Sequence, residues 1–219
     1  MKKIIILAAL VISTFGFSQK TISEGVIITT QTMSSPDEQV NMQLAMVGQT
    51  ISTTWFKNDK SRSETSNPMQ GNTVVVMDGA TNKMLMMLDN PMMGKKYMLN
   101  DIKKSEGKQK GFTVVASEET KEVLGYVCKK YDVTMMQQGT EIKMAVYTTD
   151  KIIAKSQQAA KFGDEMKGYP MLMEITMNQM GADINMKMEV TEIKAEEVAE
   201  AKFDMTPLEG YEKTEQLGM

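Results

Sequence analysis

The chain has 219 residues, of which 42% are hydrophobic, and a formal net charge of −3. This length is enough for one domain with a sizeable core. A slightly acidic chain without a basic stripe is not suited to phosphate recognition, so we expect no nucleic-acid partner. The chain has no histidine, the usual general base and commonest metal ligand, and its single cysteine, Cys128, excludes an internal disulfide framework.

The first residues have the pattern of a signal peptide. Lys2 and Lys3 precede an apolar run at positions 4–12, and Gly16 and Ser18 place small residues before a cut ahead of Gln19. The apolar run is shorter than the ~20 residues that cross a bilayer. We therefore expect residues 1–18 to be removed, leaving a periplasmic or secreted protein that is not an integral membrane protein.

Short β-branched or alternating segments follow in chain order and predict antiparallel strands. The expected strands span residues 22–33, 42–46, 51–55, 74–77, 84–88, 95–99 and 112–116. Residues 57–70 are polar, and we expect their second half to be a surface loop. The locally basic segment 103–110 (KKSEGKQK) is interpreted as a solvated loop.

Residues 126–148 form a predicted hairpin with Gln138 and Gly139 as its two turn residues. The turn fixes the register. The expected pairs are Met135 with Ile142, Val133 with Met144 and Tyr131 with Val146. After this hairpin, residues 150–162 are the best helix candidate, because they contain Ala and Gln and end before Gly163.

A second predicted hairpin, at residues 171–190 (MLMEITMNQMGADINMKMEV), has a methionine-rich face. Every second residue in both arms is apolar, which is the period of a half-buried strand. With Met180 and Gly181 as the turn, the expected pairs are Met177 with Ile184, Ile175 with Met186, Met173 with Met188 and Met171 with Val190. Glu174 then faces Lys187 on the opposite side.

The closing residues predict little further regular structure. Residues 196–202 (EEVAEAK) are expected to form a short helical turn, and residues 212–219 a flexible tail. Hairpins with one interposed helix favour a mainly β (α+β) fold, an antiparallel sheet with a helix packed on one side.

Several short motifs occur in a specific order across most of the chain. They are Gly125-Tyr126-Val127-Cys128-Lys129-Lys130-Tyr131, Tyr147-Thr148-Thr149-Asp150, Gly168-Tyr169-Pro170-Met171, Glu189-Val190-Thr191-Glu192-Ile193, and Phe203, Pro207, Gly210 and Tyr211. In this order they resemble the exported bacterial family grouped as domain of unknown function 4412. That family is similar in fold to lipoprotein carriers of the LolA and LolB type. The resemblance implies a strongly bent sheet or open half-barrel over residues 19–211, with one or two short covering helices and an apolar cavity.

The sequence gives little support for catalysis. It contains no GxSxG, phosphate loop or CxxC motif, and without histidine a Ser-His or Cys-His pair is impossible. Paired carboxylates such as Glu118-Glu119 stand in polar runs and are interpreted as solvated. We expect a protein that is not an enzyme and has no cofactor, and we name no catalytic residue.

Methionine is the unusual component, with 24 residues in the chain. Unbranched, polarizable thioethers adapt to variable apolar shapes, so our leading hypothesis is a concave surface that binds a lipid or lipoprotein acyl chain. The expected lining residues are Met171, Met173, Ile175, Met177, Ile184, Met186, Met188, Val133, Met144 and Trp55.

Two other interpretations of the methionines remain open. Thioethers are soft ligands, so Met171, Met173, Met186 and Met188 are a candidate Cu(I) or Ag(I) site. Methionines can also consume oxidants by forming repairable sulfoxides. The other interpretation is a structural module without a small ligand, in which methionine replaces Leu and Val in an ordinary core.

Overall fold

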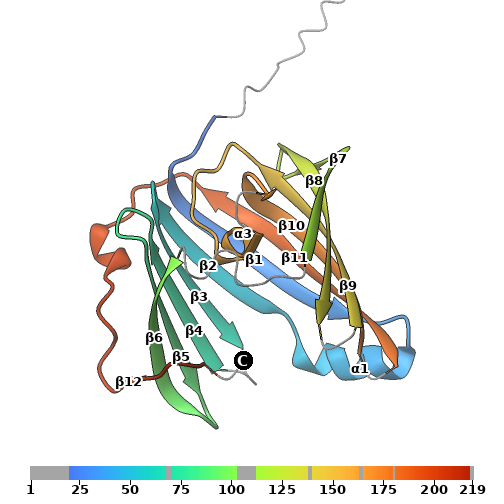
Figure 1. Cartoon of the computed structure of the whole chain (residues 1–219), viewed down its shortest axis with the longest axis horizontal. Coiled ribbons are helices and arrows are strands. Elements are labelled where there is room, and N and C mark those ends of the chain that lie inside the picture. The colour runs from blue at the N-terminus through green and yellow to red at the C-terminus, as the bar shows by residue number, and fades with distance from the viewer. Residues whose placement is uncertain are drawn as a thin grey trace, which may run out of the picture.

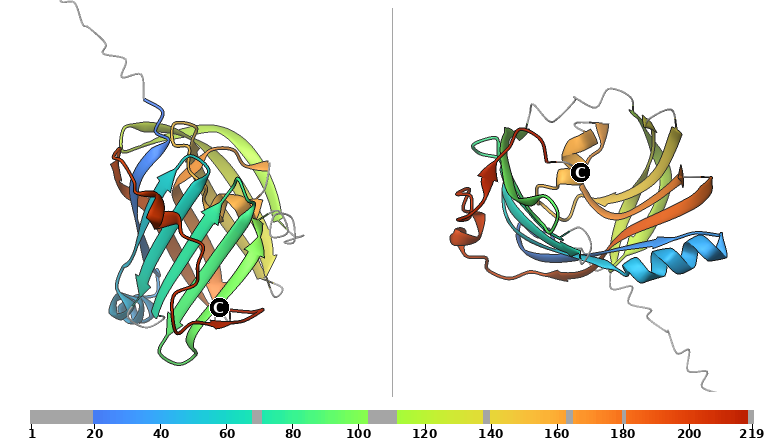
Figure 2. Two further views of the ribbon diagram at one scale, coloured as in Figure 1. Left: turned by 90° about the vertical axis from the view of Figure 1, so that its left-hand side faces the viewer. Right: turned by 90° about the horizontal axis from the view of Figure 1, so that it is seen from below.

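The computed structural model describes residues 20–67, 71–102, 112–137, 140–162, 165–179 and 181–217. The expected signal peptide lies outside these residues. Within them, one 12-stranded sheet has the order β12-β6-β5-β4-β3-β2-β1-β11-β10-β9-β8-β7, and neighbours are antiparallel except β12 and β6. The sheet curves into an open half-barrel that does not close (Figure 1; Figure 2). The expected mainly β fold with a bent sheet and a short helix is confirmed.

The elements have the following bounds. The strands are β1 (Glu24–Ser34), β2 (Thr50–Lys57), β3 (Lys60–Asn67), β4 (Gly71–Asp78), β5 (Lys83–Asn90), β6 (Gly94–Asp101), β7 (Phe112–Val123), β8 (Tyr126–Gln137), β9 (Thr140–Thr149), β10 (Tyr169–Gln179), β11 (Ala182–Lys194) and β12 (Glu212–Lys213). The helices are α1 (Glu38–Val47), α3 (Gln157–Phe162) and the 3-10 helix η2 (Glu200–Phe203).

Both predicted hairpin registers are present. β8 and β9 pair Met135 with Ile142, Val133 with Met144 and Tyr131 with Val146. β10 and β11 pair Met173 with Met188, Ile175 with Met186, Met177 with Ile184 and Glu174 with Lys187. The expected pair of Met171 with Val190 is not part of this ladder, which ends at Leu172 and Glu189. A register shift between Pro170 and Leu172 leaves Met171 in a bulge against β9. The turn residues Met180, Gln138 and Gly139 lie outside the described residues.

Register shifts and one close backbone approach accompany the curvature. Shifts occur between Ile28 and Thr29 and between Ala116 and Thr120, in addition to the one beside Met171. Bulges bend a strand and increase its twist, which curls a long sheet. At Gly25 a Cβ would lie 2.1 Å from the Lys194 carbonyl oxygen, so only glycine lets β1 approach the end of β11 this closely.

The C-terminal segment contradicts the expected flexible tail. It packs Met205 and Tyr211 against the convex face of β4 and β5, beside Val76, Leu85 and Met87. β12 then pairs in parallel with β6 at the edge of the sheet. Leu217 is buried in a different cluster, on the concave face with Val75, Met77, Met84, Met86, Leu88 and Ile102. The segment therefore passes around one edge of the sheet, because its apolar residues find partners on both faces.

Two other predicted elements are wrong. Residues 42–46 belong to α1 instead of a strand, because the Asp37 carboxylate accepts a hydrogen bond from the Val40 amide (3.0 Å) and caps the helix. The second half of the polar stretch 57–70 is largely β3, instead of a loop. Its polarity has a structural cause, since Arg62 and Glu64 form an ion pair on its convex side (2.6 Å), while hydroxyl side chains occupy its other side.

The predicted helix at residues 150–162 is shorter than expected. Ile152 forms a parallel bridge with Ile22 and is buried, so extended backbone continues past β9 and α3 begins at Gln157. The expected turn at 196–202 corresponds to η2. No helix in the described part of the chain is long and apolar enough to span a bilayer.

Candidate ligand cavity

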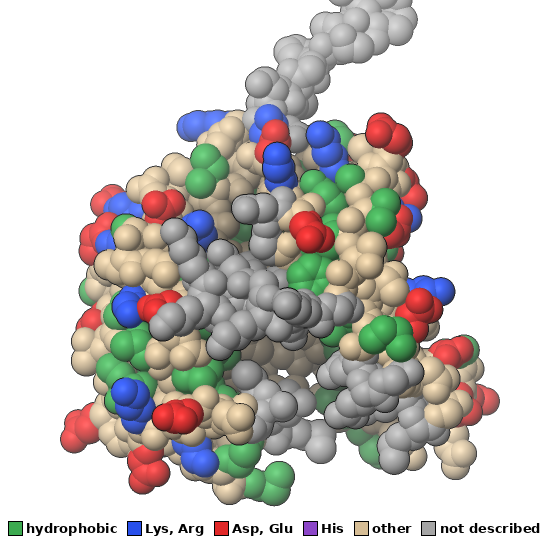
Figure 3. Space-filling view, in the orientation of Figure 1, with side chains coloured by type: hydrophobic (Ala, Val, Ile, Leu, Met, Phe, Trp, Pro, Cys, Tyr) green, Lys and Arg blue, Asp and Glu red, His purple; other side chains and the backbone are tan. Residues whose placement is uncertain are grey.

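The concave side of the sheet encloses a cavity of about 100 Å³. Its lining comes from β1–β4, from β10 and β11, and from residues 155–157 just before and at the start of α3. Figure 3 shows the two sides of the half-barrel with hydrophobic and charged side chains distinguished by colour. Because the lining strands come from both halves of the chain, the cavity spans the centre of the sheet.

One side of the cavity, here called the hydroxyl wall, consists of short alcohols on neighbouring strands. Its members are Thr29, Ser52, Thr54, Ser63, Thr65 and Thr73. The strand register places Thr54 opposite Ser63, and Ser52 opposite Thr65. The Thr54 and Ser63 hydroxyls are hydrogen-bonded at 2.7 Å, and Ser52 and Thr65 are also bonded. Cross-strand bonding therefore aligns the alcohols into a continuous surface.

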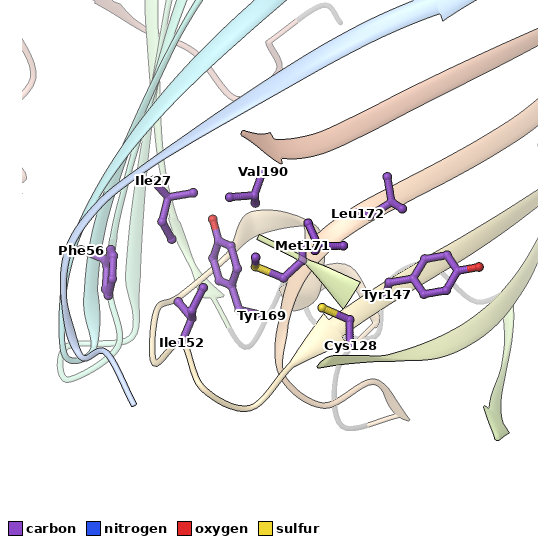
Figure 4. Close-up of a cluster of buried hydrophobic side chains, with 10 residues drawn as sticks. Ile27, Phe56, Cys128, Tyr147, Ile152, Tyr169, Met171, Leu172 and Val190 are labelled. Atoms are coloured by element: carbon purple, nitrogen blue, oxygen red, sulfur yellow. The ribbon is translucent and has the colours of Figure 1, made fainter. Parts of the chain in front are cut away.

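Tyr169, the first residue of β10, extends this surface. Its hydroxyl hydrogen-bonds Thr54, and burial raises the pKa of Tyr169, so the side chain is neutral at physiological pH. Figure 4 shows the ring among Ile27, Ile152 and Met171, in the buried cluster at one end of the cavity. Tyr169, Thr54 and Ser63 thus form a chain of three linked hydroxyls.

The facing side, here called the methionine wall, is made by Met171, Met173 and Met188. Met173 and Met188 are directly opposite each other in the hairpin, and Met171 is 1% exposed in its bulge. Beyond the cavity the same face continues through the pairs Ile175 with Met186 and Met177 with Ile184, all of them half-buried. An apolar track therefore leads from a buried end toward the outer end of the hairpin.

α3 covers the concave face between the two sides of the half-barrel (Figure 2). At its start the Gln157 amide contacts the Met86 sulfur of β5 (3.9 Å), and at its end the Phe162 ring packs edge-to-face on Phe112 of β7 (5.5 Å). The Ser156 hydroxyl accepts a hydrogen bond from the Ala159 amide (3.4 Å). A six-residue helix is thus held across the sheet by contacts at both ends.

The structure brings together most of the expected lining residues. Met171, Met173 and Met188 line the cavity, whereas Ile175, Met177, Ile184 and Met186 form the track beyond it. Val133 and Met144 lie on the same face but are buried against Phe162 and Met166. They pack beneath α3 instead of lining the cavity.

Trp55 is the exception, and its expected position is wrong. It alternates with Thr54, which lines the cavity, so Trp55 faces the convex side. There the Lys202 ammonium lies 3.9 Å from the centre of the indole ring, and the Lys202 carbonyl accepts a hydrogen bond from Arg62 (3.5 Å). Trp55 anchors η2 to the outside of the sheet.

The hydroxyl wall was missed at the sequence level. Ser61, Ser63 and Thr65 alternate with period two, as do Ser52 and Thr54, and this is the signal that could have found it. A polar segment is instead typical of a surface loop. A strand that faces a polar cavity carries the same residues.

The described residues include no group of three or more His, Cys, Asp or Glu side chains that could hold a metal ion. Cys128 is fully buried, and burial raises the pKa of its thiol to about 11, so the nucleophilic thiolate is scarce at neutral pH.

No protein-family model matches the chain, and no curated protein matches it. Among solved structures it is similar to PNGF-II in a C2 crystal form, with a TM-score of 0.51 and 15% identity over 87% of this chain and 31% of that one. A P21 form of PNGF-II gives a TM-score of 0.48 at 16% identity, covering 88% of this chain and 32% of that one. The chain spans about a third of the length of these structures. At this identity the likeness concerns the fold alone, and the resemblance to domain of unknown function 4412 stays a prediction.

Proposed function

We propose that this protein is an exported, non-enzymatic binding protein that holds an acyl chain of a lipid or lipoprotein on its concave face. The observation that carries the proposal is the apolar track, which runs from buried Met171 to half-buried Met177 on a sheet that stays open. Six residues of strand span about 20 Å. One acyl chain occupies half of a ~30 Å bilayer core, about 15 Å, so the track is long enough for it.

The side chains suit such a ligand. Methionine adapts to different apolar shapes, and each buried methylene contributes about 0.8 kcal/mol to binding without any catalytic group. The cavity of about 100 Å³ is smaller than ligand pockets of roughly 300–1,000 Å³. Full occupancy therefore requires the six-residue helix α3 to move aside, which breaks the Gln157–Met86 and Phe162–Phe112 contacts at its two ends.

The first test is the content of the protein itself. Native mass spectrometry and lipid extraction of protein purified from its own compartment should reveal a co-purifying lipid. Delipidated protein should take up a fluorescent acyl probe. A protein that neither carries nor takes up a lipid would contradict the proposal.

The second test changes the track. The double variant Met186→Gln with Met188→Gln makes two track positions polar and should weaken acyl-probe binding about thirtyfold, because each of the two lost apolar contacts is worth on the order of 1 kcal/mol. The matched control is Met46→Gln with Met92→Gln, at side chains that are 89% and 91% exposed. Thermal unfolding of both variants separates lost binding from lost folding. Equal affinity in the two variants would argue against the track.

A second candidate function, Cu(I) or Ag(I) binding, is favoured by one observation. Three of the four expected ligands, Met171, Met173 and Met188, line the same cavity, and thioethers are soft ligands. Replacing Met173 and Met188 by leucine keeps the wall apolar but removes two sulfurs, so acyl binding should persist while copper binding disappears. An anaerobic Cu(I) competition titration measures this. Failure of the unaltered protein to compete with a weak chelator would contradict the copper function.

A further inference from the structure

We propose that the ligand is a single-chain amphiphile with an anionic head, and that Lys155 and the hydroxyl wall hold the head while the methionine wall holds the tail. This inference rests on the proposed acyl-chain binding and adds the chemistry of the head group. It follows from the asymmetry of the cavity, which is polar on one side and at one end.

Lys155 lies at this polar end. Its side chain lines the cavity and also an adjoining open depression, which is shared with Asn58, Asp59, Asp150 and Gly168. Its Cε would lie 2.9 Å from a Cβ built on Gly79, so glycine at position 79 leaves the space through which the lysine stem passes. A cation thus projects from the edge of a cavity that has alcohols on one side and methionines on the other.

Several neighbouring cations are ion-paired, whereas Lys155 forms no ion pair with another described residue. Lys57 contacts Glu24 at 3.0 Å, Lys60 contacts Glu200 at 2.8 Å, and Lys151 contacts Asp150 at 3.4 Å. Over the described ranges, Lys155 has no carboxylate within ion-pair distance, although Asp59 stands beside Gly79. An anionic ligand head would supply the missing partner, with a charge-assisted hydrogen bond stronger than a neutral one.

The hydroxyl wall has hydrogen-bonding capacity to spare. Three hydroxyls, those of Tyr169, Thr54 and Ser63, carry three protons, and the two bonds that link them use two. The third proton is available to an oxygen in the cavity. A wholly apolar ligand would desolvate these alcohols without replacing their bonds to water, which is unfavourable.

The polar end and the apolar track are joined in the order that an amphiphile needs. Tyr169 and Pro170 begin β10 at the end where Lys155 lies, and Met171, Met173, Ile175 and Met177 follow along the same strand. A head at Lys155 therefore directs the tail beneath α3 along the methionine wall.

The experiment compares three probes of equal chain length: hexadecanoate, 1-hexadecanol and hexadecyl phosphate. Each displaces a bound fluorescent acyl probe below its micelle concentration. Hexadecanoate should bind about tenfold tighter than hexadecanol, the range of one charge-assisted hydrogen bond. In Lys155→Gln this preference should fall to about twofold or less, because hexadecanoate loses more affinity than hexadecanol. Lys187→Gln, on the convex side, should keep the full preference.

Each outcome has a distinct meaning. Equal affinity for hexadecanoate and hexadecanol in the unaltered protein, or a preference that survives Lys155→Gln, overturns the head-group inference while leaving acyl-chain binding intact. Binding of no probe overturns the proposed function itself. Hexadecyl phosphate that binds as tightly as hexadecanoate, or tighter, supports recognition of negative charge, and the stronger of the two identifies the natural head. Thr54→Val should weaken all three probes, because it breaks the hydroxyl chain.

Discussion

Single carboxylates fasten the C-terminal segment to the sheet. Glu24, at the start of β1, accepts hydrogen bonds from the Val198 amide (2.8 Å) and from the Lys57 ammonium (3.0 Å). The Val198 contact first, and then Lys57, lower the pKa of Glu24 below its ordinary 4.5. A carboxyl group with a lower pKa in the folded state stabilises the fold above its unfolded pKa, and loses this contribution as the pH falls through the folded value.

We therefore predict that Glu24→Gln lowers stability at pH 7 and weakens its dependence on pH below about 4.5. Urea unfolding at pH 7 and at pH 3.5 measures both effects, and hydrogen exchange of the Val198 amide should accelerate. Glu196→Gln, at an exposed position on the same segment, is the control. An unchanged Val198 exchange rate would show that Glu24 does not hold this segment.

At the residue scale, the sequence predicted which residues pair across two strands better than it predicted which face of the sheet a side chain occupies. The pairs of the methionine hairpin follow from alternation and from a two-residue turn, both of which are local. The prediction for Trp55 was wrong because alternation assigns residues to two faces of a strand without indicating which face is concave. β2 carries an aromatic side chain on each, with Phe56 in the buried cluster and Trp55 under Lys202. Which of the two faces is concave depends on the curvature of the sheet and on the C-terminal segment that covers the convex face.

At the element scale, the C-terminal segment from Met205 to Leu217, here called the strap, passes around one edge of the sheet. It covers the convex face with Met205 and Tyr211, adds β12 to the edge of β6, and buries Leu217 on the concave face. An unpaired edge is a template for association with another chain, and β12 blocks part of it. At the opposite edge, β7 is interrupted by a register shift and carries charged residues, which give the same protection.

The strap should contribute measurably to stability. Leu217 is 9% exposed, so Leu217→Ala should lower the free energy of unfolding by about 2 kcal/mol. Leu208→Ala, at a side chain on the same segment that is 51% exposed, should change it by less than ~0.5 kcal/mol. Denaturant unfolding of the two variants makes the comparison. Equal effects would mean that the end of the strap is not anchored.

The elements that sequence reasoning missed share a cause. α1 was hidden because its Met42, Leu44 and Met46 mimic a strand, although the Asp37 cap was visible. β3 was hidden because its concave residues are alcohols, and the strap was hidden because its partners are distant in sequence. Local periodicity cannot report either a polar interior or a long-range contact.

At the scale of the whole molecule, curvature makes the concave face that we propose as the binding surface. A sheet of twelve strands that neither closes nor stays flat leaves one concave face, and α3 covers only part of it. The bent antiparallel sheet could be anticipated, but the division of its concave face into alcohols and thioethers could not. That division appears only when strands from both ends of the chain are placed together.

The position of β1 in the strand order has a consequence for how the molecule assembles. β1 to β6 follow one another as neighbours, and so do β7 to β11, so each half can form by pairing strands that are successive in the sequence. The two halves meet where β1 pairs with β11, for example through the Thr30 and Thr191 hydroxyls, 161 residues apart (3.3 Å). The hydroxyl wall belongs to the first half and the methionine wall to the second. Neither half contains the cavity alone, so the cavity forms only when β1 pairs with β11.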